Sequence, residues 1–207
     1  MISKELQSTM TPDEALKRLK EGNQRFVNNV HANCDYREEV KTTAQGQYPF
    51  ATILSCIDSR TSSVLIFDQS IGDIFVTRIA GNVVNPDILG SLEYAVKYAG
   101  AKLILVLGHT KCGAVTSACN HVQDGNITGL LDKIQPAVER AKGLENELDY
   151  VDRVAALNVD EAVARIRNES AIIRQLELEG KVKLLGAMYD IATGKVEFEE
   201  IDVEAAT

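Results

Sequence analysis

The chain has 207 residues, of which 45% are hydrophobic, and its 30 acidic and 22 basic side chains give a net charge of −8. A chain of this length buries roughly 70% of its unfolded surface, so its core needs no disulfide or metal to stay folded. The negative charge repels phosphate backbones, which argues against nucleic acid as a partner. The longest aliphatic run, residues 103–107, is far shorter than the roughly 20 residues of a membrane helix, so we expect no membrane partner.

The N-terminal residues contain no apolar segment like that of a signal peptide. We therefore expect a cytoplasmic protein, unless a targeting segment has already been removed. Thiols in such a protein are more often packed, metal-bound or reactive than paired in disulfides. Cys34 and Cys119 are expected to be packed as small hydrophobic side chains, and His31 and His121 to lie on the surface.

The first predicted element is a helix over residues 12–29. Thr11 and Glu14 have capping-box spacing, and Pro12 suits a first helical turn. Leu16 and Leu19 begin its apolar stripe. This helix either packs on its own domain or lies across a second subunit. The polar stretch 31–48 has no periodicity, and no element is predicted there.

From residue 49 onward, short aliphatic or β-branched runs alternate with helical patterns. Strands are predicted at 50–55, 74–79, 103–108, 182–191 and 196–201, and helices at 62–68, 86–98, from about 111, at 130–142 and within 145–179. This alternation indicates an α/β fold with a mostly parallel β-sheet flanked by helices. We expect a single domain, with an N-terminal helical arm (about 1–48), a sheet core (about 49–125) and C-terminal helices and strands (about 126–207). The acidic residues near the end predict a solvated edge or tail.

Two of the predicted strands end in residues that bind metals. Cys56 follows the first strand, and His109 and Cys112 follow the third. The carboxyl ends of parallel strands meet at one edge of the sheet, where reactive groups collect. Two thiolates and one imidazole, with a fourth position open, are the composition of a catalytic zinc site. The alternative is a core cysteine plus a capped histidine. Cys119 lies about 10 Å from Cys112 along an intact helix and cannot share this ion.

An acid and a base follow Cys56 at positions 58 and 60. Asp58 and Arg60 either form a structural ion pair that ties a loop, or they form an outer layer of the metal site. In the second case Asp58 accepts a hydrogen bond from metal-bound water, and Arg60 holds the carboxylate in place.

These residues resemble those of the β-class carbonic anhydrases. The family's Cys-x-Asp-x-Arg motif stands here at residues 56–60, and its His-x-x-Cys motif at residues 109–112. Further matching segments occur in family order at residues 46–47, 71–78, 80–82 and 91–95. The resemblance runs from the N-terminal helix to the final strand. It implies a β-carbonic anhydrase-like fold and reversible hydration of carbon dioxide to bicarbonate and a proton.

The resemblance also assigns roles to residues. It implies one zinc per chain on Cys56, His109 and Cys112, with zinc-bound hydroxide as the nucleophile and Asp58 and Arg60 beside it. By the same resemblance, Gln47 donates an amide hydrogen bond to a substrate oxygen, while Phe75 and Tyr94 line the cleft. On pattern alone, however, these three are a loop residue, a core residue and one face of a helix.

The resemblance further implies a homodimer or homotetramer whose cleft is shared between chains. Family members that place the aspartate on zinc by binding bicarbonate elsewhere have a Trp-containing pocket, and this chain has no Trp. We therefore expect the open arrangement, with Asp58 paired to Arg60. Residues 61–63 and Ala114 depart from the usual family pattern and leave the subgroup open. No proton-transfer residue is identified.

Two other functions compete with carbon dioxide hydration. A hydrolase of a related small molecule such as carbon disulfide has the same fold and ligands. A catalytically silent zinc-binding regulatory protein is the alternative outside enzymes, but a purely structural zinc needs neither Asp58 nor Arg60. A nucleotide-binding module is disfavoured because no Gly-rich phosphate-binding motif follows any predicted strand.

Overall fold

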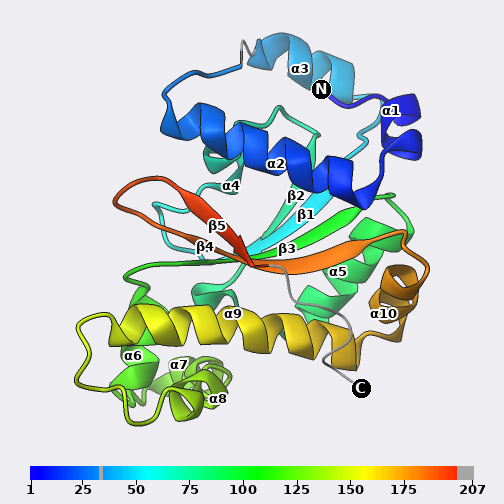
Figure 1. Ribbon diagram of the computed structural model, residues 1–207. Helices are drawn as coiled ribbons and strands as arrows, with labels where there is room; N and C mark the ends of the chain where they lie inside the picture. Colours follow the sequence, from blue (N-terminus) through cyan, green and yellow to red (C-terminus); the bar gives the residue numbers. More distant parts are fainter. Residues whose placement is uncertain (33–34, 200–207) are drawn as a thin grey trace.

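A five-stranded sheet forms the centre of the protein, seen here in a computed structural model that describes residues 1–32 and 35–199 (Figure 1). The strands are β1 (Ala51–Ser55), β2 (Ile74–Arg78), β3 (Leu103–His109), β4 (Lys183–Tyr189) and β5 (Val196–Glu199). They are ordered β2-β1-β3-β4-β5, with β5 alone antiparallel to its neighbour. The prediction of a mostly parallel sheet flanked by helices is confirmed.

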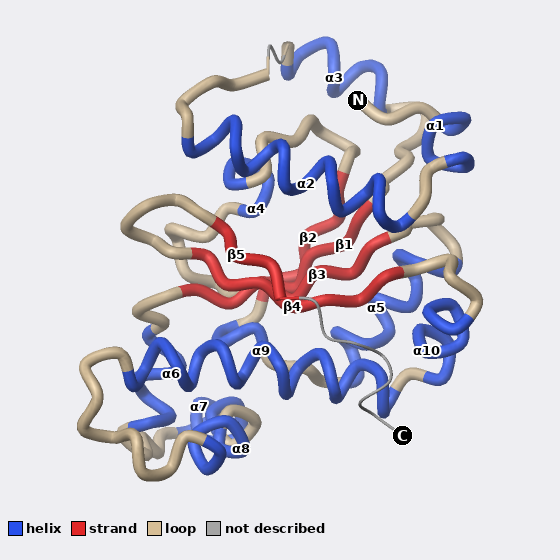
Figure 2. Tube along the Cα trace, in the orientation of Figure 1, coloured by secondary structure: helices blue, strands red, loops and turns tan. Residues whose placement is uncertain are grey.

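Helices cover both faces of this sheet (Figure 2). In chain order they are α1 (Lys4–Thr9), α2 (Pro12–Val27), α3 (Tyr36–Thr43), α4 (Ser63–Ile66), the 3-10 turn η1 (Ala80–Asn82), α5 (Pro86–Lys97), α6 (Gly113–Cys119), α7 (Gly125–Leu131), α8 (Gln135–Arg140), α9 (Tyr150–Glu169) and α10 (Ala171–Leu178). None of the helices in the described part of the chain combines the length and the apolar character required to cross a membrane.

The central strand β3 is buried along its whole length, and its side chains alternate between two cores. Leu103 and Leu105 join a cluster that includes Leu16 and Leu19 of α2. Ile104 and Val106 join a second cluster, with residues of α5, α9 and α10. The helix α2 therefore packs on the sheet of its own chain, which is one of the two arrangements left open by the sequence.

Asn23 of α2 contacts two distant segments through one side chain. Its amide nitrogen donates to the carbonyl oxygens of Ile66 (3.2 Å) and Gly194 (2.9 Å), and its amide oxygen accepts from the Val196 nitrogen at 2.9 Å. Asn23 is buried, so each of these bonds replaces one to water. The N-terminal helix is thereby tied both to α4 and to the β4–β5 turn.

On the opposite face, α9 approaches the sheet unusually closely. A Cβ atom added to Gly108 would lie 2.5 Å from Cγ2 of Val159, and one added to Gly186 would lie 2.5 Å from Cγ1 of the same valine. Any side chain at either glycine would push α9 away, so the absence of a Cβ at both positions permits this contact. Gly108 immediately precedes His109, and α9 is therefore packed directly against the end of β3.

The structure differs from the predicted elements in four helical regions, of which the first is α1, a helix that precedes the first predicted element. Tyr36–Thr43 forms α3 in the stretch where no element was predicted, because Asp35 caps it by accepting from two backbone N–H groups. The predicted helix at 130–142 is two helices, α7 and α8, and that within 145–179 breaks at Ser170, which caps α10. Cys34 and residues 200–207, with most of the predicted acidic tail, lie outside the described residues.

Candidate metal centre

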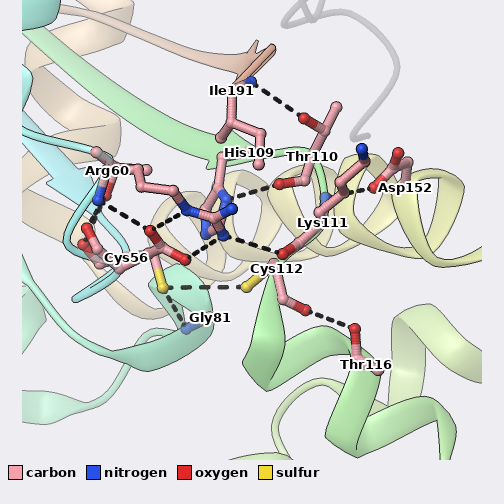
Figure 3. Close-up of polar contacts among 12 residues, drawn as sticks. Cys56, Arg60, Gly81, His109, Thr110, Lys111, Cys112, Thr116, Asp152 and Ile191 are labelled. Atoms are coloured by element: carbon pink, nitrogen blue, oxygen red, sulfur yellow. Dashed lines mark hydrogen bonds and ion pairs between the residues drawn. The ribbon is translucent and has the colours of Figure 1, made fainter.

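Three potential metal ligands meet where β1 and β3 end. Cys56 directly follows β1, His109 is the last residue of β3, and Cys112 is the residue that precedes α6. The parallel pairing of Ser55 with Leu107 brings these strand ends side by side. The two sulfur atoms and a ring nitrogen all lie within 4.8 Å of one another, and each residue is at most 3% exposed. Figure 3 shows the three side chains turned toward one another.

The geometry of this group fits a tetrahedral metal ion. Two sulfurs at 2.3 Å from a tetrahedral ion would be about 3.8 Å apart, and the Cys56 and Cys112 Sγ atoms are 3.9 Å apart. His109 Nδ1 lies 2.9 Å from the Thr110 carbonyl oxygen and donates to it, which leaves Nε2 as the unprotonated nitrogen. Nε2 is buried without a hydrogen-bond partner. A metal ion would satisfy this nitrogen.

The ionisation of the two thiols also favours a cation between them. A hydrogen bond with Cys112 lowers the pKa of Cys56 to about 4, with help from the Gly81 amide against the effect of burial. The same hydrogen bond and burial raise the pKa of Cys112. Two adjacent buried thiolates repel each other, so both ionise only when a positive charge lies beside them.

Asp58 and Arg60 form a two-point ion pair at the mouth of the group. Arg60 donates from Nε to Asp58 Oδ1 (2.9 Å) and from a terminal nitrogen to Oδ2 (2.7 Å), and its backbone N–H also donates to Oδ1 at 2.9 Å. These bonds lower the pKa of the Asp58 carboxyl below its usual range. Asp58 is therefore an ionised acceptor at neutral pH, in the pairing expected for the open arrangement.

Two residues that the sequence did not single out hold the loop that carries Cys56. Gly81 donates its backbone N–H to Cys56 Sγ at 3.3 Å. Arg78, at the end of β2, donates to the carbonyl oxygens of Cys56 (2.9 Å) and Asp58 (2.6 Å). Both lie in segments that resemble the family, but only their positions in space reveal these contacts.

Phe75 and Tyr94 line a separate groove between β2 and α5, with a volume of about 570 Å³. Its walls contain no member of the Cys56, His109 and Cys112 group. Gln47 is exposed, and its Cβ lies 3.7 Å from where a Cβ on Gly72 would be. Within one chain, the structure therefore brings the three potential ligands, Asp58 and Arg60 together, and joins Phe75 to Tyr94, but leaves Gln47 apart.

Among the described residues, the remaining thiol and histidines lie outside the cluster. Cys119 is partly buried, and burial raises the pKa of its thiol. His31 and His121 are both exposed. The prediction that these two histidines lie on the surface is confirmed.

Comparison with known proteins agrees with this site. Residues 51–196 match the family model described as carbonic anhydrase. Carbonic anhydrase 2 of Mycobacterium tuberculosis is 37% identical over 89% of this chain and 91% of its own length, and a carbonic anhydrase of Mycolicibacterium smegmatis is 36% identical over 90% and 92%. The chain belongs to the carbonic anhydrase family.

Solved structures specify the class within that family. The β-carbonic anhydrase CafA of Aspergillus fumigatus superposes with a TM-score of 0.74 at 28% identity, covering 94% of this chain and 93% of that one. One of two tetrameric β-carbonic anhydrases from Sordaria macrospora superposes with a TM-score of 0.72 at 27% identity, covering 78% of this chain and 85% of that one. The chain is a β-class member.

Proposed function

We propose that this enzyme catalyses the reversible hydration of carbon dioxide to bicarbonate and a proton, with one zinc ion held by Cys56, His109 and Cys112. The observation that carries the proposal is the buried group of two thiols and one unpartnered imidazole nitrogen at the strand ends. Zinc in such a site leaves a fourth position open and acts as a Lewis acid that lowers the pKa of water to near neutrality.

Asp58 orients the reacting oxygen. Its carboxylate accepts hydrogen bonds only, because the pairing with Arg60 keeps its pKa low. A water molecule at the mouth of the site can therefore donate one hydrogen bond to Asp58 while an oxygen lone pair points away from it. Arg60 prevents the carboxylate from turning, and the bidentate contact defines the direction of that hydrogen bond.

Substrate binding uses residues of the groove at the sheet edge. Phe75 and Tyr94 offer an apolar wall for a small neutral molecule. Gln47 is distant from the ligands of its own chain, and we assign its amide to the cleft of a second copy in a homodimer or homotetramer. Support comes from the tetrameric state of the Sordaria macrospora enzymes and from the position of β2 at the open edge of the sheet.

The competing functions have weaker support. The similar sequences are carbonic anhydrases over about nine-tenths of both chains, which favours hydration over carbon disulfide hydrolysis. A silent zinc-binding protein would have no use for the Asp58–Arg60 pair, in which the Arg60 side chain is half-exposed.

Stopped-flow measurement of carbon dioxide hydration by the purified protein tests the proposal, with metal content determined on the same sample. We expect about one zinc per chain and hydration well above the buffer rate, lost on metal removal and restored by zinc. Carbon disulfide is the control substrate. Hydration at the buffer rate by the zinc-loaded protein, or faster turnover of carbon disulfide, would overturn the assignment.

A further inference from the structure

The loop between His109 and Cys112 has a backbone conformation that needs support. Lys111 lies between these two residues with a φ of +53°, in the left-handed region that residues with a side chain rarely adopt. Asn and Asp tolerate this region through local hydrogen bonds of their short side chains, and lysine has no such means. Because Lys111 lies in the short loop between two candidate ligands, its backbone conformation determines where both ligand side chains point.

Asp152 supplies the support from outside the loop. Its Oδ1 atom accepts a hydrogen bond from the Lys111 backbone nitrogen at 2.6 Å, across 41 positions of sequence (Figure 3). A carboxylate that accepts from a backbone N–H makes a charge-assisted bond, stronger than one between neutral groups. Asp152 is not itself a member of the group of potential ligands.

The helix that carries Asp152 is fixed to the strand that carries His109. Val154 and Val159 of α9 are fully buried, and Val159 lies where side chains on Gly108 and Gly186 would otherwise be. Close-packed interiors resist displacement of whole elements. Asp152 is thus held at a fixed position relative to the end of β3.

The carbonyl group of Lys111 faces the Asp58–Arg60 pair. The Lys111 carbonyl oxygen lies 3.4 Å from a terminal nitrogen of Arg60, which donates to it. One residue of the loop therefore contacts Asp152 through its N–H and Arg60 through its carbonyl. A change in the Lys111 conformation would move both potential ligands of this loop and remove a partner of Arg60.

We propose that Asp152 is a positioning residue that holds the His109–Cys112 loop in its metal-binding conformation and so slows the release of the metal. This inference rests on the proposed metal site. Residues that orient metal ligands typically contribute about 10–100-fold to metal affinity or activity. We expect an effect of this size from Asp152, although its hydrogen bond is to the Lys111 backbone and not to a thiol or the imidazole.

The test compares zinc release from four full-length proteins: wild type, Asp152→Ala, Asp152→Asn and Glu169→Ala. Glu169 is the matched control, an exposed acid at the other end of α9 that pairs with Arg165. The rate of zinc transfer to an excess of a chromophoric chelator is measured. We expect release from Asp152→Ala to be about 10–100-fold faster than from wild type. Asp152→Asn should be intermediate, because its amide oxygen still accepts the Lys111 N–H, and Glu169→Ala should match wild type.

Two further measurements separate positioning from general stability. In the cobalt-substituted protein, Asp152→Ala should shift the thiolate-to-cobalt absorption bands, while the thermal midpoint of the metal-free protein changes no more than in Glu169→Ala. Adding Lys111→Gly to Asp152→Ala should recover slow release, since glycine adopts positive φ freely. If Asp152→Ala does not fold, Asp152→Asn serves in its place.

The outcomes distinguish this inference from the proposed function. A wild-type protein that binds no zinc would overturn the metal site and the role of Asp152 with it. A wild-type protein that binds zinc, together with Asp152 variants that release it at the wild-type rate, would overturn the role of Asp152 alone. Equal acceleration in Glu169→Ala would also overturn it.

Discussion

The two ends of the proposed reaction site are built very differently. At the carboxyl ends of β1 and β3, the group of Cys56, His109 and Cys112 is at most 3% exposed and is surrounded by backbone hydrogen bonds. The groove of Phe75 and Tyr94 lies at the sheet edge, and Tyr94 is 61% exposed. One chain thus completes the geometry of the potential metal ligands but leaves open the groove that we propose for the substrate.

This contrast indicates which properties a single chain controls. Ligand positions follow from adjacent parallel strands and two short loops, so each folded chain forms them by itself. The groove borders an edge strand whose outer side pairs with no other strand among the described residues. We therefore expect substitutions at the strand ends to change metal binding and chemistry, and substitutions in the groove to change only substrate use.

The largest effect is expected from Cys56→Ser. A serine hydroxyl is a poor zinc ligand, so this protein should lose its metal and its hydration rate should fall by about 10³-fold or more. Cys119→Ser is the matched control, because that thiol is outside the group of three. Metal analysis and stopped-flow hydration measure both. A fully active Cys56→Ser protein would show that the strand ends are not the metal site.

Asp58→Ala should separate chemistry from metal binding. We expect zinc content to stay at the wild-type level and kcat to fall by about 10–100-fold, because the carboxylate orients the reacting water but does not hold the metal. Asp190→Ala is the control, since that half-buried acid accepts hydrogen bonds from Ala192 and Thr193 in the turn after β4 and is not a member of the group of potential ligands. Unchanged kcat in Asp58→Ala would show that the Asp58–Arg60 ion pair has only a structural role.

Zinc affinity should depend on pH through one thiol rather than two. Cys56, with its pKa lowered to about 4, is already ionised at neutral pH, whereas Cys112, with its pKa raised, is still protonated. Binding therefore displaces one thiol proton, and the affinity should rise about tenfold for each pH unit over the range below the pKa of the water at the fourth zinc position, where that water releases no proton. Competition with a chelator of known protonation measures the slope. A slope of zero or of two would contradict this assignment.

The smallest effect is expected in the groove. Tyr94→Ala should lower kcat/KM by about 3–10-fold, with zinc content and the cobalt spectrum unchanged, because it removes one wall of the substrate site. Tyr98→Ala is a close control: its ring stacks on Tyr94 with centroids 6.0 Å apart, but it does not line the groove. Loss of metal in Tyr94→Ala would mean that the two regions are not independent.

Most of the candidate metal site could be predicted from the sequence, because each of its residues is marked by the predicted strand next to it. Cys56, His109 and Cys112 each stand within a few residues of an aliphatic strand, and the rule that parallel strand ends meet is general. By contrast, position 152 gave no signal, since an acid in the first turn of a helix is common and is explained by the helix dipole. Its contact with Lys111 exists only because α9 packs against β3.

Missed and divided helices have a similar explanation. The helix α3 buries only Glu39, so it has no apolar stripe to detect. Its capping residue Asp35, with Glu38 three positions on, was the available signal. The break between α9 and α10 occurs at Ser170, whose hydroxyl accepts from Ile173 and starts a new helix. Continuous charge patterning around this serine concealed the boundary.

Asn23 has a consequence for the order in which the chain can fold. Its partners lie at residues 66, 194 and 196, so a growing chain offers the last two only after at least 171 further residues have been made. Until then, the amide of this buried side chain must keep its bonds to water. The helix α2 is thus secured only after β4 and the turn that follows it have been made, and these distant segments become one cooperative unit only when both are present.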